Sequence, residues 1–236
     1  MSKVDLNKKE KKNALLQTAF ELFTDKGFAK TTISDISSKA GLAKGTFYLY
    51  FKDKYDLRDI LIAHKTGQLF AEAHHALLQQ SIEGFENQLF FVVDFIIEKL
   101  AANPKLLQFI SKNLSWGIFR VAFEQQVADE SEESREFYSY YRELVQESSI
   151  TDLEAELLLF TILELVGSTC YSCILYEQPL PIEEYMPYLH RSIHHILLSY
   201  FNKNEYSQTK GSEYRSLFLL IKETNFDNSS KSSRSL

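Results

Sequence analysis

The residues that point most directly to a chemistry lie in the stretch Thr31–Asp56. Five of them suit a polyanion by type and spacing: Lys44, Gly45, Thr46, Tyr48 and Tyr50. Lysine and tyrosine side chains bind phosphates, neighbouring side chains can enter the major groove, and glycine admits a close approach to the backbone. The alternative is that these are ordinary surface residues. The whole pattern, rather than any single residue, favours DNA as the partner.

Two short helices must position these groups. Thr32 and Asp35 have the spacing of a capping box at a helix start, and Gly41 ends that helix with a residue that accepts positive φ. The next helix, residues 44–50, is too short to be stable alone. We therefore expect it to be held by two inward anchors, Phe47 and Phe51.

Longer helices flank this pair. Residues 8–26 place apolar side chains on one stripe and are followed by Gly27, which predicts a first helix. Asp53 and Asp56 form a cap-like pair at the start of another helix that runs to about Gln80. Because Lys54 stands at the beginning of this helix, movement of its far end should tilt the N-terminal segment.

The segment TTISDISSKAGLAKGTFYLYFKDKYDL closely resembles the helix-turn-helix signature of TetR-family transcriptional regulators. The shared features are T-x-x-x-I-a, A-G-v, K-G-x-[FL]-Y-x-[YH]-F and K-x-x-L, and with the first helix the resemblance covers about 50 residues. It implies an N-terminal DNA-binding domain and a divergent helical domain that binds ligand and forms a homodimer.

The resemblance also implies roles for single residues. Thr32 is implied near a phosphate, and Lys44 and Gly45 at the DNA backbone. Thr46 and Tyr48 are implied at or near base edges, and the remaining phosphate contacts are Tyr50 and Lys54. Two positions depart from the family pattern: Ala43 supplies no side-chain cap to the recognition helix, and Leu49 stands where an aromatic residue often occurs.

The composition favours a helical protein whose N-terminal segment, residues 1–60, is basic. The 236 residues include only 8 Gly and 4 Pro, which favours an all-α fold. Residues 1–60 hold 12 Lys and Arg against 8 Asp and Glu, a net charge of +4, whereas the remainder carries −10. We expect a helix-turn-helix domain at 1–53, a ligand-binding and dimerisation domain at 54–203, and a polar extension at 204–236 with a possible short helix and a disordered tail.

The sequence predicts further helices within residues 54–203. Residues 88–102 predict a buried helix, although LFFVV alone also fits a strand. Helices are expected at about 153–176 and 188–201, separated by prolines at 179, 181 and 187 that break and restart the chain. Because both are apolar on more than one face, we expect them to pair with a second copy of the chain.

A ligand pocket is predicted among helices of the body. Its candidate residues, mostly aromatic, are His64, Phe109, Trp116, Phe119, Phe123 and Tyr171. As single residues these side chains are more often plain core. Cys170 with Cys173 and His190 with His194 each place two metal-ligand types on one helical face, but a closed zinc site needs four, so packing is the expected role. We expect no metal, no cofactor and no catalytic residue, and we expect His74 and His75 at the surface.

The sequence thus favours a cytoplasmic homodimeric repressor that a small, partly apolar effector releases from a palindromic operator. The alternative is an adaptor or activator that uses the same fold without ligand-induced release. An enzyme that retained a DNA-binding head would need convergent acids, bases or metal ligands, and the body shows none in its sequence pattern.

Overall fold

The computed structural model describes residues 3–111, 139–143, 145 and 150–201, and all regular elements in these ranges are helices. Their order is α1 (Lys3–Asp25), α2 (Ile33–Lys39), α3 (Lys44–Phe47), α4 (Lys54–Leu78), α5 (Phe85–Ala102), α6 (Pro104–Ser111), α9 (Asp152–Tyr176) and α10 (Ile182–Phe201). The expectation of an all-α fold is confirmed. The predicted extension at 204–236 lies outside the described residues.

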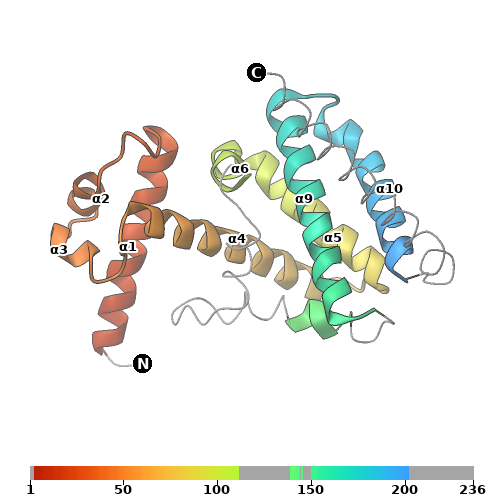
Figure 1. Ribbon diagram of the computed structural model, residues 1–236, viewed down its shortest axis with the longest axis horizontal. Coiled ribbons are helices and arrows are strands. Elements are labelled where there is room, and N and C mark those ends of the chain that lie inside the picture. Colours follow the sequence, from red (N-terminus) through yellow and green to blue (C-terminus); the bar gives the residue numbers. More distant parts are fainter. Residues whose placement is uncertain (1–2, 112–138, 144, 146–149, 202–236) are drawn as a thin grey trace, which may run out of the picture.

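Helices α1 to α3 form a head at one end of α4, and the remaining helices pack around its other end (Figure 1). The head is built on a small apolar core to which every one of its helices contributes: Leu15, Leu22, Ile36, Phe47, Phe51 and Leu57. The rings of Phe47 and Phe51 lie 5.4 Å apart and are 0% and 1% exposed. These two residues are the inward anchors that the spacing predicted, and they hold a recognition helix of only four residues.

Local capping fixes the ends of the head helices. Asp35 N donates to Thr32 Oγ1 at 3.1 Å, and Thr32 N donates to Asp35 Oδ2 at 3.0 Å, which completes the predicted capping box of α2. Gly41 follows α2 with φ of +70°, a conformation that favours glycine. Ala43 caps α3 without any side-chain hydrogen bond, also as predicted. Short-range chemistry therefore sets the geometry of the helix-turn-helix.

The body consists of α5, α6, α9 and α10, of which α5 and α6 pack on α4, while α9 and α10 pack on each other and on α5. Residues 88–102 lie within α5, so the helical interpretation of LFFVV is confirmed. Pro104 is the first residue of α6, where its missing N–H has no intrahelical partner to lose. Within the body, α6 is the helix that contacts both α1 of the head and α9, so it connects the two parts.

The prediction that Pro187 breaks the chain before a helix at 188–201 was wrong, because α10 begins at Ile182 and continues through Pro187. The proline forfeits one hydrogen bond, to the carbonyl of Glu183, close to the helix start. Ile182 and Leu189, on either side of it, are buried in the core. We attribute the continuity of the helix to this packing.

Helix α9 is long and apolar enough to cross a membrane by length and composition, but this is weak evidence, because core helices of globular proteins also meet the criterion. Only 28% of its most apolar 18-residue window is buried within the chain. Five of its exposed residues follow a single stripe with alternating spacings of four and three residues: Leu153, Leu157, Phe160, Glu164 and Gly167. This is the pattern of a helix that packs against another helix.

Candidate functional site

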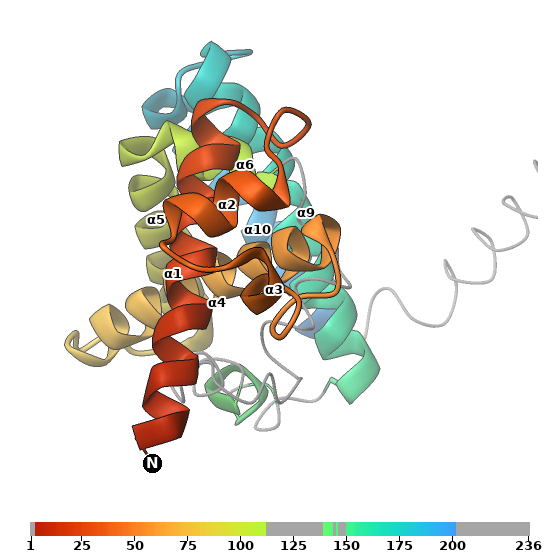
Figure 2. The ribbon, with the colours of Figure 1, turned by 90° about the vertical axis from the view of Figure 1, so that its left-hand side faces the viewer.

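The residues predicted to meet DNA gather on the outer end of the head, which Figure 2 shows facing the viewer. Lys44, Gly45 and Tyr48 are exposed on and just after α3, and Thr32 is exposed at the start of α2. Thr46 and Tyr50 are half-buried. The fold thus presents a cation, a phenol and a hydroxyl on the short helix whose other face is anchored by Phe47.

Two residues of this surface have features that the packing of the chain does not require. A Cβ added to Gly45 would meet nothing within 4 Å, so the protein itself does not demand glycine there. Leu49 is 79% exposed, which makes it the most exposed large apolar side chain among the described residues. Both observations fit a surface that a partner approaches closely.

Lys54 is engaged inside the head. Its Nζ donates to Phe28 O at 2.8 Å and to Thr31 O at 2.9 Å, and it lies 4.3 Å from the centroid of the Phe28 ring. These contacts tie the α1–α2 turn to the first residue of α4. The phosphate role implied for Lys54 must compete with this arrangement, because two of the three ammonium hydrogens are already used.

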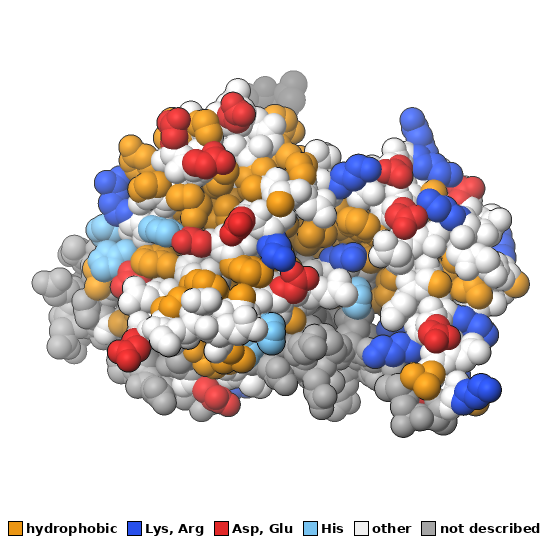
Figure 3. Space-filling view, turned by 180° about the vertical axis from the view of Figure 1, so that it is seen from behind, with side chains coloured by type: hydrophobic (Ala, Val, Ile, Leu, Met, Phe, Trp, Pro, Cys, Tyr) orange, Lys and Arg blue, Asp and Glu red, His pale blue; other side chains and the backbone are white. Residues whose placement is uncertain are grey.

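The charge of the head is visible on the molecular surface. Most Lys and Arg side chains on the face drawn in Figure 3 lie toward the end formed by the head. Several are paired: Lys26 with Asp35 at 3.2 Å and Lys39 with Glu21 at 3.0 Å. Among the described residues no ion pair is found for Lys44, so its charge is available to a partner.

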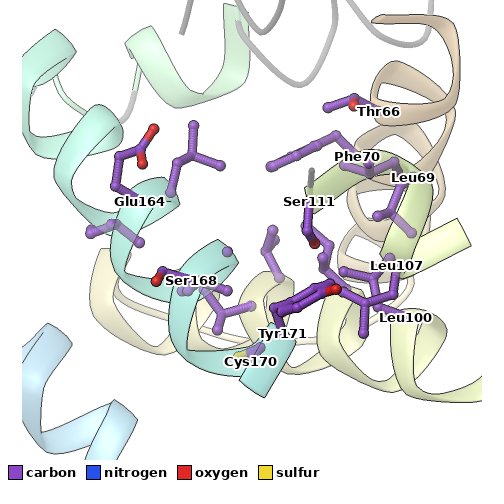
Figure 4. A pocket seen from close by; sticks show the side chains of 18 of the residues that line it. Thr66, Leu69, Phe70, Leu100, Leu107, Ser111, Glu164, Ser168, Cys170 and Tyr171 are labelled. Atoms are coloured by element: carbon purple, nitrogen blue, oxygen red, sulfur yellow. The ribbon is translucent and has the colours of Figure 1, made fainter. Parts of the chain in front are cut away.

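The second candidate site is a cavity of about 480 Å³ in the body (Figure 4). It lies within the 300–1,000 Å³ range of sites that hold small molecules. Its described lining comes from α4, α5, α6 and α9 and from Tyr141: Thr66, Leu69, Phe70, Leu89, Val92, Val93, Ile96, Leu100, Leu107, Ile110, Ser111, Tyr141, Leu159, Ile162, Leu163, Glu164, Val166, Gly167, Ser168, Cys170, Tyr171 and Ser172. Most of these side chains are apolar, so the cavity suits an apolar ligand.

A few polar groups interrupt this lining. Thr66 is 2% exposed, and no partner for its hydroxyl is found in the described part of the chain. The Tyr141 hydroxyl donates to Ala155 O at 2.7 Å. Burial raises the pKa of the Cys170 thiol to about 12, so this cysteine stays protonated near neutral pH and acts as a small apolar group.

Only some of the residues predicted to form the pocket line the cavity. Tyr171 lines the cavity, whereas His64 and Phe109 do not. The Phe109 ring instead packs on α1, 5.4 Å from the Phe20 ring and 6.3 Å from the Phe23 ring. Trp116, Phe119 and Phe123 lie outside the described residues. The wall of the cavity formed by α4 was not predicted from the sequence, although Thr66, Leu69 and Phe70 recur at helical spacing.

The histidines of α10 bind carboxylates of α5. His190 Nε2 lies 2.6 Å from Asp94 Oδ1, and His194 Nδ1 lies 2.6 Å from Glu86 Oε1. These pairs account for both histidines as links between helices, in line with the packing role expected for them. Within the described ranges no group of three or more candidate metal ligands occurs. His74, expected at the surface, is buried beside Tyr140, whose ring lies 4.8 Å away.

The head matches a known family. The sequence model described as "Bacterial regulatory proteins, tetR family" matches residues 15–59, which include α2, α3 and the start of α4. The uncharacterized HTH-type transcriptional regulator YerO of Bacillus subtilis (strain 168) is 53% identical over 45 residues, 19% of this chain and 16% of YerO. The fatty acid metabolism regulator protein of the same organism is 33% identical over 108 residues, 46% of either chain. These matches identify the head, residues 15–59, as a DNA-binding segment of the TetR type.

The fold of the chain is shared with a solved structure along most of its length. A solved structure of the transcriptional regulator FadR from Bacillus subtilis in complex with stearoyl-CoA superposes with a TM-score of 0.51 at 19% identity. The superposition covers 76% of this chain and 96% of FadR. At this identity the likeness shows the fold alone. The sequence matches to the two curated relatives span less than half of their lengths.

Proposed function

We propose that this chain is a dimeric transcriptional repressor that holds a palindromic operator through α3 and is released by a small-molecule effector bound in the body cavity. The observation that carries the proposal is that one helix, α6, borders the cavity and also packs on the DNA-binding head. The match of the head to the TetR family model supports it. The proposed repressor acts in the cytoplasm, where the operator lies, and has no enzymatic activity.

At the DNA, Lys44 and Tyr50 contact phosphates, and Thr46 and Tyr48 lie at base edges. Thr32, the exposed cap of α2, lies near a further phosphate. These roles are supported by the exposure of Lys44 and Tyr48 and by the open space around Gly45. Phosphate contacts position a protein on the duplex, whereas base-edge contacts give sequence preference.

The proposed dimer forms through α9 and α10. The apolar stripe of α9 is exposed in the single chain, and α10 adds Tyr188 and Leu198, which are 50% and 41% exposed. A two-fold axis between two such pairs gives a four-helix interface. The two heads would then lie in successive major grooves about 34–36 Å apart, which requires a palindromic operator.

The link between cavity and head runs through both faces of α6. On one face, Leu107, Ile110 and Ser111 line the cavity. On the other, Lys105 Nζ lies 2.7 Å from Asp25 Oδ1, and Phe109 packs on α1. A ligand that displaces α6 therefore shifts α1 directly, in addition to any movement of α4, which carries Thr66 and Phe70 at the cavity and Lys54 at the head. The effector and DNA then weaken each other's binding by the same factor.

The effector has an apolar body that the cavity can enclose. An acyl chain is one such body, and it is suggested by the FadR structure with stearoyl-CoA. The aliphatic walls contributed by α5, among them Leu89, Val92 and Ile96, favour a chain or fused-ring skeleton over a polar metabolite. Binding then releases DNA by moving α6.

The test of the DNA-binding role uses a palindrome selected by the purified protein from random duplexes and measured by fluorescence anisotropy. The double variant Lys44→Ala with Tyr48→Ala should weaken binding at least about tenfold, because it removes a phosphate contact and a base-edge contact. The matched control is Lys99→Ala, which removes an exposed lysine that pairs with Glu72 in the body. Equal affinity of the double variant and the control would refute the DNA-binding role and favour an adaptor. Intact DNA binding that no cavity ligand alters would favour an activator or a ligand-independent regulator.

A further inference from the structure

The described lining of the body cavity carries an acidic side chain and no basic one. Glu164 is the one ionisable acid or base on its described lining apart from tyrosine and cysteine, and that lining contains no lysine, arginine or histidine. The carboxylate has no ion pair or hydrogen bond with the other described residues. On the described lining, a single unpaired negative charge therefore borders a mostly apolar volume.

Glu164 lies where the lining of the cavity meets the exposed stripe of α9, and in the single chain its carboxylate keeps contact with water. It is exposed on α9, one helical turn before Ser168. In Figure 4 the two side chains stand on one wall of the cavity, and Thr66, Leu69 and Phe70 stand on the opposite wall. Because the residue is exposed, its carboxylate keeps part of its hydration in the empty protein.

Aromatic rings add to the attraction for positive charge. Tyr171 lies on the same helix as Glu164 and lines the cavity, and Phe70 projects into the cavity from α4. Ring faces carry negative electrostatic potential and attract cations, quaternary ammonium groups included. The carboxylate favours a cationic head group, and the rings elsewhere on the lining add a preference for positive charge within the cavity.

The opposite wall has a second unsatisfied group. Thr66 lines the cavity, and its buried hydroxyl has no hydrogen-bond partner among the described residues. Buried hydroxyls in proteins are normally paired. A ligand atom that accepts or donates a hydrogen bond at the α4 wall would satisfy this group after a small shift of the side chain, which supports the cavity as a binding site.

We propose that the body cavity binds lipophilic cations: molecules with an apolar skeleton that fills the cavity and a positively charged nitrogen that lies against Glu164. This rests on the proposed function, since it names the ligand class of the same effector site. Anionic amphiphiles are disfavoured. The carboxylate of a fatty acid, or the phosphates of an acyl-CoA, would come close to Glu164 without a described cation to compensate them.

The test compares four molecules that share a twelve-carbon chain and differ in charge: dodecyltrimethylammonium, dodecanol, dodecanoate and lauroyl-CoA. Binding to the full-length protein is measured by calorimetry below the micelle concentration of each. We expect the cation to bind roughly five- to tenfold more tightly than the neutral alcohol, because a partly exposed ion pair and a cation–π contact each contribute modestly. Dodecanoate and lauroyl-CoA should bind more weakly than the alcohol.

Two variants test whether the preference for the cation depends on the Glu164 carboxylate. In Glu164→Gln the preference for the cation over the alcohol should fall to about twofold or less, while the alcohol binds as before. Glu183→Gln removes an exposed carboxylate of α10 that does not line the cavity, and it should leave the preference unchanged. Tighter binding of dodecanoate or lauroyl-CoA than of the cation overturns the inference, as does an unchanged preference in Glu164→Gln or the binding of none of the four molecules.

Measuring DNA affinity in the presence of each ligand tests the effector role separately from the preference for cations. If the cation binds in a Glu164-dependent way but does not change the affinity for the selected palindrome, the ligand class stands and the effector role is refuted. If lauroyl-CoA alone binds and releases DNA, the effector role stands and the cation inference is refuted.

Discussion

Replacement of Lys54 by alanine separates a structural role from a DNA-contacting one. The ammonium group donates to Phe28 O at 2.8 Å and to Thr31 O at 2.9 Å, and it lies over the Phe28 ring. Hydrogen bonds from a charged group each contribute about 1.5–3 kcal/mol. Because Lys54 is only half-buried and water can solvate the freed carbonyls, we take about 2–3 kcal/mol for the whole set. For a chain of this length that corresponds to a melting temperature lower by roughly 5–10 °C.

Two assays decide between the roles. Thermal unfolding should show the loss of stability, and DNA affinity measured from low to high salt should show an unchanged slope. A lost phosphate contact would instead reduce the slope of log K against log salt by about 0.9. Lys44→Ala is the matched comparison, expected to reduce the slope and to leave the melting temperature within about 2 °C, since it breaks no described ion pair. A stable Lys54→Ala protein with a reduced slope would show that the ammonium binds phosphate and that its two carbonyl contacts are incidental.

Three further predictions concern the head and its link to the body. Gly45→Ala should stabilise the protein by up to about 1 kcal/mol in chemical denaturation, because the new Cβ meets open space, yet weaken DNA binding by obstructing close approach; equal DNA affinity would show that no close approach occurs. Phe109→Leu, which loosens the contact of α6 with α1, should leave ligand affinity within about twofold while reducing ligand-induced DNA release, read by anisotropy in titrations with ligand. A hydrogen bond from the backbone of Thr32, aided by Lys26, holds the pKa of Asp35 below its ordinary value. This stabilisation is present above about pH 4 and lost as the pH falls through the lowered pKa, so Asp35→Asn should flatten the acid limb of a stability-against-pH curve.

The head could be predicted almost residue by residue because its determinants are local. The capping box of Thr32 and Asp35 and the positive φ of Gly41 act within a few residues, and the anchors Phe47 and Phe51 are visible from their helical spacing although they pack against other helices of the head. Each is a feature of type and spacing that a linear sequence displays directly. The uncapped start of α3 at Ala43 was equally visible.

Errors arose where distant segments decide the outcome. Pro187 normally ends a helix, but α10 continues through it because Ile182 and Leu189 are buried on either side. Phe109 was expected in the pocket, yet the packing of α6 on α1 turns its ring toward Phe20. In each case a local preference of a few kcal/mol is outweighed by tertiary contacts that the sequence pattern does not reveal.

The sequence by itself determined the helical class, the position of the DNA-binding head and the side chains that face outward from it, because helix periodicity and capping depend on neighbours in the chain. Only the tertiary structure decided what the body can bind. The cavity is assembled from α4, α5, α6 and α9, so its volume, the isolation of Glu164 and the unpaired hydroxyl of Thr66 exist only once those helices are packed together. The same holds for Lys54, whose two carbonyl partners lie 26 and 23 residues earlier in the chain.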